Sequence, residues 1–293
     1  MIAVDRGRYS VLIDGVPVSA MRARELGRKG IVVGDRVDVV GDLSGAADTL
    51  ARIVRVAERD TVLRRTADDT DPFERVIVAN AEQLVIMSAL ADPAPSFGLI
   101  DRCLVAALSA DIEPILLLTK ADLVESPEPA LARYEPLSVP TFVIGRGSDL
   151  TPIRERLVGH FSVFIGHSGV GKSTLINSLV PDTNRATGIV SAVGKGRHTS
   201  TSVVAIALPE GGWVIDTPGV RSFGLAHVSA DDILWAFPDL EDGATSCPPG
   251  CEHQSAAAGC RLDDWVASGN STTDRLAAFR RLLSSRTGGA EVG

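Results

Sequence analysis

One segment combines glycines, a lysine and a serine at the spacing of a phosphate-binding loop. Residues 166–173 fit the pattern G-x-x-x-x-G-K-[ST], between an apolar run and an amphipathic run. Glycines let the backbone curl so that its N–H groups point at phosphate oxygens, and a helix start adds its positive dipole end. We expect Lys172 to bind the β- and γ-phosphates and Ser173 to ligate Mg²⁺; the alternative is a glycine-rich turn without a ligand. The predicted nucleotide-binding residues are Gly166, His167, Ser168, Gly169, Val170, Gly171, Lys172, Ser173 and Thr174.

A second segment indicates which base is bound. Thr119, Lys120, Ala121 and Asp122 end an apolar run and resemble the guanine-specificity element N-K-x-D of GTPases. A carboxylate at Asp122 can accept hydrogen bonds from both N1–H and N2–H₂ of guanine, whereas adenine offers no such pair of donors. Thr119 replaces the usual Asn, and a hydroxyl cannot make both contacts of an amide. Taken alone, a charged cluster at the end of a strand is an equal alternative.

A third segment is similar to the D-x-x-G switch element. It reads Asp-Thr-Pro-Gly at residues 216–219 and follows the apolar run 213–215. We expect Asp216 to hold Mg²⁺ through water and the Gly219 N–H to contact the γ-phosphate. Many GTPases place a glutamine after this glycine to orient the attacking water. Val220 stands there and cannot hydrogen-bond.

The polar loop 194–201 lies between the phosphate loop and residues 216–219, where a mobile switch loop is expected. A hydroxyl in this loop can reach Mg²⁺, and Thr199 is the first candidate, with Thr201 the second. His198 is the candidate catalytic residue, because an imidazole there can position the attacking water. The alternative for His198 is a solvated loop histidine.

The order of these segments is unusual. Thr119 precedes Gly166 by 47 positions, whereas most GTPases place the phosphate loop before the base-specificity element. Circular permutation can build the same sheet, because domain termini are often close together. The new end of such a domain follows the D-x-x-G element, so a segment attached there would be affected when the switch moves.

A cluster near the C-terminus indicates a metal site. Three thiols and one imidazole occur in the spacing C-x₃-C-x-H-x₆-C, and together they form a closed set suited to structural, tetrahedral Zn²⁺. No ligand position is left for water, so catalysis at this metal is not expected. Unrelated reduced thiols are the alternative. The predicted ligands are Cys247, Cys251, His253 and Cys260.

The elements that position these residues fall into three parts. Residues 1–68 contain short strands around residues 9–13, 16–18 and 51–56, with a strand pair or one bent strand at 31–40. These strands predict a small barrel: an OB-fold first, an SH3-like barrel second. The polar stretch 64–73 is typical of a linker.

Residues 69–225 alternate apolar strands with helices, which predicts a parallel sheet covered on both faces. The expected helices are 100–109 and one starting at Lys172. Residues 226–293 form a helical part with helices around 230–237 and 272–286. The expected strands are 83–88, 115–118, 141–144, 163–165, 203–208 and 213–215.

Composition limits the possible classes. The chain has 293 residues, of which 45% are hydrophobic and 23% are charged, which excludes wholesale disorder. It has no apolar run of membrane-spanning length, and residues 1–9 do not read as a signal peptide.

The formal net charge is -8, yet residues 1–66 hold twelve Lys and Arg against nine Asp and Glu. This excess suits an RNA-facing surface, or else a solvated exterior. The final helix, which carries four arginines, leaves the same two alternatives open.

Together, the barrel, the permuted motifs and the Cys₃His cluster resemble the RsgA family of small-subunit-dependent GTPases. Three further short segments are also similar to that family: Gly196-Arg197-His198-Thr199, Val76-Ala79-Asn80 and Ile100-Asp101-Arg102. The resemblance implies a cytoplasmic GTP hydrolase acting in late maturation of the 30S ribosomal subunit. It implies binding to 16S rRNA near the decoding region, with hydrolysis stimulated by the subunit and coupled to release. It also implies a catalytic role for His198. The expected cofactors are GTP or GDP, Mg²⁺ and one structural Zn²⁺, and we expect a monomer with no membrane partner.

Two rival functions follow from particular residues. Val220 in place of a glutamine suits an RNA-bound checkpoint that holds GTP or GDP with little turnover. A P-loop ATPase or small-molecule kinase would require adenine preference, which Asp122 opposes.

Overall fold

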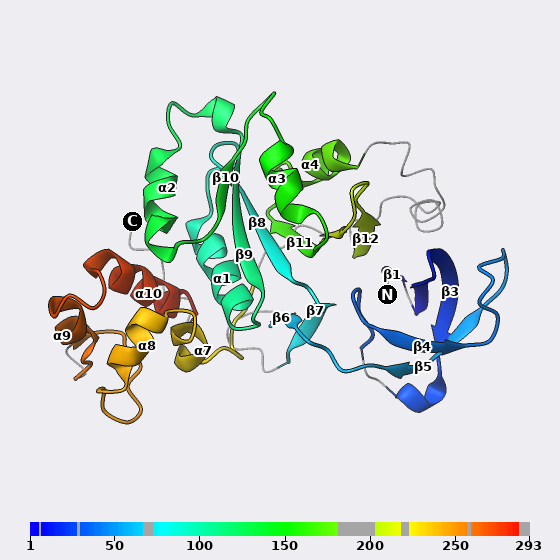
Figure 1. Cartoon of the computed structure of the whole chain (residues 1–293), viewed down its shortest axis with the longest axis horizontal. Coiled ribbons are helices and arrows are strands. Elements are labelled where there is room, and N and C mark those ends of the chain that lie inside the picture. Colours follow the sequence, from blue (N-terminus) through cyan, green and yellow to red (C-terminus); the bar gives the residue numbers. More distant parts are fainter. Residues whose placement is uncertain are drawn as a thin grey trace.

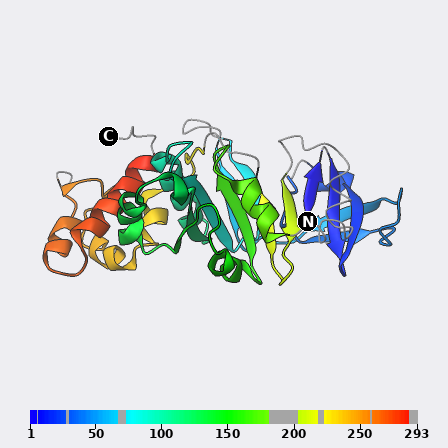
Figure 2. The same ribbon diagram turned by 90° about the horizontal axis from the view of Figure 1, so that it is seen from above.

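The structure is a computed structural model that describes residues 1–5, 7–27, 30–66, 73–180, 203–217, 223–256 and 259–286. Three parts follow one another along its longest axis (Figure 2). The C-terminal helices lie at one end, an α/β sheet lies in the middle, and the N-terminal strands lie at the other end. This multidomain arrangement agrees with the predicted fold class.

The central sheet has the strand order β10-β9-β8-β11-β13-β12. All neighbouring pairs are parallel except β12 with β13. The prediction of a parallel sheet is therefore wrong for β12. A turn of five residues joins β12 to β13, too short for the crossover that a parallel pair needs. The strands are β8 (Gln83–Ala89), β9 (Glu113–Thr119), β10 (Thr141–Val143), β11 (Phe161–Gly166), β12 (Val204–Ala207) and β13 (Trp213–Asp216).

Helices bury both faces of this sheet. Because side chains alternate along a strand, Leu84 and Ile86 of β8 pack on the side of α1, and Val85 and Met87 pack on the side of α3 and α4. Every residue of β8 is buried, as expected for a strand covered twice. The helices and 3₁₀ turns of this part are α1 (Phe97–Leu108), η2 (Ala121–Leu123), α2 (Glu128–Tyr134), η3 (Glu135–Leu137), α3 (Thr151–Leu157) and α4 (Lys172–Leu179).

The N-terminal strands have the order β1-β2-β3-β5-β4, with β3 parallel to β5. This order and the parallel pair belong to the OB-fold, whereas an SH3-like barrel pairs its strands antiparallel. The core of this part is separate and contains Val18, Ala20 and Ile53. The expected strand 31–40 is confined to its second half. The elements are β1 (Ala3–Asp5), β2 (Arg8–Ile13), β3 (Val16–Arg22), η1 (Arg24–Leu26), β4 (Val37–Val40) and β5 (Ala51–Val56).

The barrel and the α/β sheet are joined by strand pairing and by a close backbone approach. β1 pairs antiparallel with β12, so the strands form one continuous sheet. At Gly34 a Cβ atom would lie 1.8 Å from the carbonyl oxygen of Ala79, so only glycine allows this contact. The predicted linker is partly a strand, because β6 (Val62–Arg65) pairs antiparallel with β7 (Arg75–Ala79).

The C-terminal helices pack on α1 rather than standing apart. Helix α10 lies beside α1, and the two share one core that includes Leu104 and the ring of Phe279 (Figure 1). The expected helix 230–237 ends at Leu234, and Pro238 begins the next helix. The helices are α7 (Ala230–Leu234), α8 (Pro238–Ala244), α9 (Leu262–Ala267) and α10 (Thr273–Arg286). Among the described residues, no helix has both the length and the apolar character needed to cross a membrane.

Candidate nucleotide and metal sites

The phosphate-loop sequence occupies the turn between β11 and α4. Gly169 and Gly171 have φ angles of +87° and +94°, which side-chain-bearing residues rarely adopt. A Cβ atom on Gly166 would lie 2.5 Å from the carbonyl oxygen of Met87, so glycine also lets β11 approach β8. Helix α4 begins at Lys172, which directs its N-terminus at the loop. This strand–loop–helix geometry is the context that the motif requires.

Lys172 joins the loop to the end of β13. Its ammonium forms an ion pair with the Asp216 carboxylate and donates a 2.6 Å hydrogen bond to the carbonyl oxygen of Thr217. The Thr217 hydroxyl donates in turn to the carbonyl oxygen of Phe164 at 2.6 Å. The predicted phosphate ligand and the predicted Mg²⁺ residue are therefore brought together at one edge of the sheet.

Thr119, at the end of β9, contacts the phosphate loop directly. Its side chain is buried, and its hydroxyl donates a 2.7 Å hydrogen bond to the carbonyl oxygen of Val170. The residue that departs from the expected asparagine thus links the base-specificity segment to the loop.

Asp122 lies beside the loop that follows β10. Its carboxylate accepts a 2.9 Å hydrogen bond from the backbone N–H of Arg146. A Cβ atom on Gly145 would lie 2.9 Å from both the backbone nitrogen and the Oδ1 of Asp122, so only glycine permits this approach. Lys120 has a left-handed backbone, and its ammonium donates to the carbonyl oxygen of Asp92.

Two of these segments were not assigned to the site from the sequence: residues 144–147 are where a base-contacting loop is expected but show no recognisable motif, and nothing singled out Asp92. The loop containing Gly145 and Arg146 follows β10, and the segment containing Asp92 follows β8. One signal was available. Parallel strands end at the same edge of a sheet, so the residues after each predicted strand are candidates for the site.

Several predicted site residues lie outside the described part of the chain. They are the catalytic candidate His198, the switch candidates Thr199 and Thr201, and Gly219 with its neighbour Val220. Their assignments stay predictions. His167, Ser168, Ser173, Thr174 and Ala121 lie in the segments described above, and the hydroxyl-bearing residues among them are exposed.

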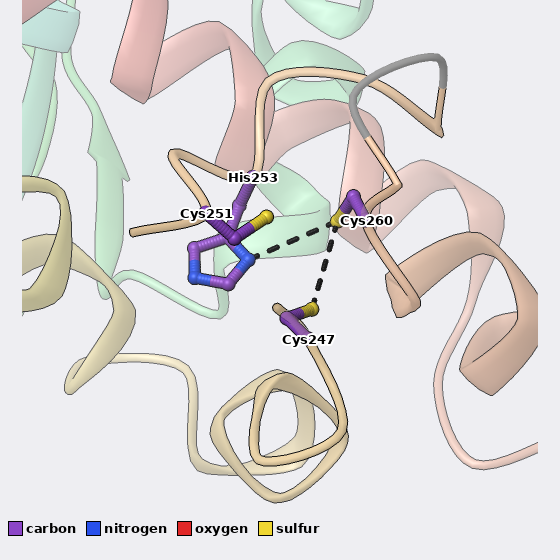
Figure 3. Close-up of side chains that lie close together, drawn as sticks. All are labelled: Cys247, Cys251, His253 and Cys260. Atoms are coloured by element: carbon purple, nitrogen blue, oxygen red, sulfur yellow. Dashed lines mark hydrogen bonds between the residues drawn. The ribbon is translucent and has the colours of Figure 1, made fainter. Parts of the chain in front are cut away.

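The four predicted metal ligands meet in the loops between α8 and α9 (Figure 3). Their ligand atoms all lie within 4.8 Å of one another. Cys260 Sγ lies 4.0 Å from Cys247 Sγ and 3.8 Å from His253 Nδ1. A tetrahedral Zn²⁺ with Zn–S bonds of about 2.3 Å needs an S–S edge of about 3.8 Å. The donor set and the spacing therefore fit one zinc ion.

Without a metal, the two buried ligands of this cluster, Cys260 and His253, are neutral. Burial raises the pKa of the Cys260 thiol to about 11 and lowers the pKa of His253. The imidazole is thus held neutral, as a metal ligand must be, and a divalent cation among the sulfurs favours the thiolate.

Neighbouring groups hold the ligands in place. The backbone N–H of Arg261 donates to Cys247 Sγ at 3.3 Å, and the Arg280 guanidinium donates to the carbonyl oxygen of His253 at 3.1 Å. Arg280 is fixed in turn by an ion pair with Asp263. Such outer contacts orient ligands at metal sites.

The phosphate loop, the base-specificity segment and the residues after β13 lie at one edge of a sheet, in permuted chain order. This arrangement defines a GTP-binding P-loop protein of the circularly permuted class.

Comparisons with known proteins agree. The family model described as RsgA GTPase matches residues 56–226. The small ribosomal subunit biogenesis GTPase RsgA of Ectopseudomonas mendocina is 40% identical over 218 residues, which are 71% of this chain and 63% of the relative. The protein of the same name from Pseudomonas syringae pv. tomato is 38% identical over 264 residues, which are 87% of this chain and 75% of the relative.

Two solved structures share the fold. YjeQ from Thermotoga maritima has a TM-score of 0.70 at 23% identity and covers 98% of this chain and 97% of its own. YloQ, described as a circularly permuted GTPase, has a TM-score of 0.68 at 24% identity, covering 100% of this chain and 96% of its own.

The chain belongs to the RsgA GTPase family, which confirms the resemblance seen in its motifs. Membership of this GTPase family implies GTP or GDP and Mg²⁺ as ligands, and the Cys₃His cluster is consistent with one zinc ion.

A Thr119→Val substitution tests the link to the phosphate loop. It leaves the Val170 carbonyl without this donor, and losing such a bond costs about 1 kcal/mol or more, roughly fivefold in affinity. We expect fluorescent GDP to bind at least that much more weakly, as measured by titration. Thr119→Ser keeps the hydroxyl and is the control. Equal affinities of the Val and Ser variants would contradict the role.

The metal site predicts one zinc ion per purified chain by elemental analysis. Cys260→Ser should remove nearly all of it, because a tetrahedral site that loses a buried thiolate loses its closed shell. Cys103→Ala is the matched control, since Cys103 is fully buried in α1 and is not one of the four ligands. Unchanged zinc content in the Cys260 variant would rule the site out.

Proposed function

We propose that the chain is a GTP hydrolase that acts in maturation of the small ribosomal subunit. The observation that carries this proposal is the meeting of Lys172, Asp216, Thr119 and Asp122 at one edge of the sheet, in a chain of the RsgA GTPase family. The curated relatives are named for this role.

Each part of the nucleotide has a candidate partner. The backbone of residues 166–174 and Lys172 would hold the phosphates, and Ser173, Thr199 and Asp216 would hold Mg²⁺. Asp122 would accept from the guanine edge, and Gly219 would contact the γ-phosphate. The metal ion, when bound, neutralises charge on the phosphates. His198 would orient the attacking water, the task that Val220 cannot perform.

One face of the barrel suits an RNA partner. Arg8, Met21, Arg52 and Val40 are aligned across β2, β3, β5 and β4, and all four are exposed. Neither arginine forms an ion pair with another described residue. The strand face of an OB-fold binds oligonucleotides, and guanidinium groups bind phosphates.

Other arginines are engaged within the chain. Arg36, Arg55 and Arg59 of the barrel form ion pairs with aspartates. All four arginines of α10 also bond internally, to side chains or carbonyl oxygens. We therefore assign the rRNA contact to the barrel face rather than to α10.

Finer points of the proposal follow the family resemblance. They are contact with 16S rRNA near the decoding region, stimulation by the subunit, release after hydrolysis, a cytoplasmic location and a monomeric state. We also propose the division into residues 1–68, 69–225 and 226–293. It is supported by the separate core of the barrel.

The alternative is an RNA-bound checkpoint that holds GTP or GDP with little turnover. Val220 favours it, because a valine cannot orient the attacking water.

Turnover measurements separate these functions. We expect the purified chain to hydrolyse GTP slowly and ATP not at all, with small subunits raising GTP turnover by about tenfold or more, as an added catalytic contact can. Phosphate release measured with each nucleotide, with and without subunits, provides the test. Binding of GTP with flat turnover would favour the checkpoint. Comparable ATP hydrolysis, indifferent to subunits, would overturn the GTPase assignment.

Substitutions on the barrel face test the RNA contact. The double variant Arg8→Ala, Arg52→Ala should bind small subunits more weakly. The slope of log affinity against log salt concentration should also become less steep, by the amount expected for about two lost phosphate contacts. Sedimentation with subunits over a series of salt concentrations measures both. Arg55→Ala is the control, because Arg55 is exposed but already paired with Asp38 at 2.5 Å. An equal effect of the control and the double variant would exclude a specific face.

A further inference from the structure

The C-terminal helical part carries an excess of negative charge that its own arginines do not neutralise. Residues 226–286 contain nine Asp and Glu, five Arg and no Lys. Three of these arginines are paired with aspartates of the same part, and Arg281 is paired with Asp101 of α1. Arg286 donates to the carbonyl oxygen of Val228. The acidic residues that form no ion pair within the described part of the chain are Asp231, Asp232, Glu241, Asp242, Glu252 and Asp274.

Two of these unpaired carboxylates line a cavity of about 370 Å³ beside the metal cluster. The cavity is bounded by the start of α7, the end of α8, the metal-ligand loop and the last residue of α10. Asp231 belongs to α7, and Glu252 lies between the ligands Cys251 and His253. Both carboxylates are exposed, so a group that enters the cavity meets two negative charges. Bound Zn²⁺ does not reverse this sign, because three thiolates outweigh one divalent ion.

Trp235 extends this acidic region onto the surface of α7. It is 77% exposed, the largest fraction among the large hydrophobic residues of the described chain. Its backbone N–H donates to the carbonyl oxygen of Asp231, four residues earlier, so the two side chains lie on one face of α7. Trp265 differs, because its Nε1 donates to the carbonyl oxygen of Asp239 at 2.8 Å. An exposed indole beside carboxylates attracts cations, since the ring face is negative.

We propose that the cavity and Trp235 form a docking site for a basic polypeptide segment. An arginine or lysine side chain of the partner enters the cavity and meets Asp231 and Glu252, and a neighbouring basic side chain stacks on Trp235. Opposite charges across an interface favour encounter and exclude partners of the wrong sign. The site requires no nucleotide, so it goes beyond the proposed function.

Arg286 favours a polypeptide over a metal ion or another small cation. It lines the same cavity, and its Nη1 donates to the carbonyl oxygen of Val228 at 3.1 Å. Its Nε is buried and has no hydrogen-bond partner among the described groups. A buried donor without an acceptor costs free energy. A peptide offers both groups that the cavity requires: a cationic side chain for the carboxylates and a carbonyl oxygen for this donor.

Charge also distinguishes this partner from RNA. Phosphates are repelled by the unpaired carboxylates, whereas the barrel presents Arg8 and Arg52 at the opposite end of the molecule (Figure 2). Residues 287–293, which follow Arg286, contain one glutamate and no basic residue, so their charge does not suit the cavity either. The two ends of the molecule therefore suit partners of opposite charge.

A fluorescent peptide in which arginine alternates with glycine tests the site in the full-length, zinc-loaded chain. We expect fluorescence anisotropy to show binding that weakens with added salt, because salt screens exposed charges. The same peptide with serine in place of arginine should not bind. Asp231→Asn combined with Glu252→Gln should weaken binding by about fivefold, as expected for the loss of two exposed ion pairs. Trp235→Ala should weaken it by about threefold or more, through loss of the cation–π contact.

The matched control is Asp242→Asn combined with Asp274→Asn. It removes the same charge from two exposed carboxylates that do not line the cavity, and it should leave the affinity nearly unchanged. Elemental analysis must show that each variant keeps its zinc, which separates loss of docking from loss of the metal cluster. If the cavity variant loses zinc, Asp231→Asn alone replaces it and should still weaken binding.

Four results would overturn the docking site. Equal weakening by the cavity variant and the control would show general attraction to an acidic surface. Full affinity in both the cavity variant and Trp235→Ala would place the peptide elsewhere. Tighter binding of a single-stranded RNA of similar length, lost in Trp235→Ala, would assign the face to nucleic acid. A dimer of the chain in sedimentation, also lost in Trp235→Ala, would assign the face to a second copy.

Discussion

The parallel register of four neighbouring strands is the constraint on which the nucleotide site depends. In this register Gly166 lies opposite Met87, Ala89 lies opposite Thr119, and Phe164 lies opposite Asp216. The carboxyl ends of β8, β9, β11 and β13 therefore meet at one edge, where the phosphate loop, the base-specificity segment and Asp216 converge. Strand position and direction fix this convergence, and the order in which the chain visits the strands does not. A permuted chain can therefore build the same site.

Much of this could be predicted from local sequence. The phosphate loop, Asp122 and the Cys₃His ligands are short motifs whose spacing is itself the chemical requirement, and the buried strands are marked by continuous apolar runs. The antiparallel direction of β12 was within reach of the sequence, because the expected strands 203–208 and 213–215 leave only residues 209–212 between them, too few for a parallel crossover. The contact of Thr119 with Val170 could not be predicted, since it joins residues 51 positions apart.

The charges show a further limit of sequence reading. Helix α10 is as rich in arginine as an RNA-binding helix would be. Its arginines are nevertheless engaged within the chain: Arg281 is bonded to Asp101 of α1, and Arg275 to Asp239 of α8. Their partners come from distant segments, so local charge counting cannot distinguish a structural guanidinium from one that faces a ligand. In the barrel, Arg55 and Arg52 lie three residues apart, and only the strand register separates the paired one from the other.

The pairing of β1 with β12 has a consequence for fragments of this chain. β12 is the last strand of the α/β sheet, and β1 covers its outer edge through Ala3 and Val204. An uncovered edge strand offers free N–H and C=O groups to other chains and promotes aggregation. The barrel thus protects the sheet that binds nucleotide. A fragment that begins after the barrel would expose the edge of β12. Poor solubility of such a fragment would therefore result from this exposed edge and would not indicate a defect in nucleotide binding.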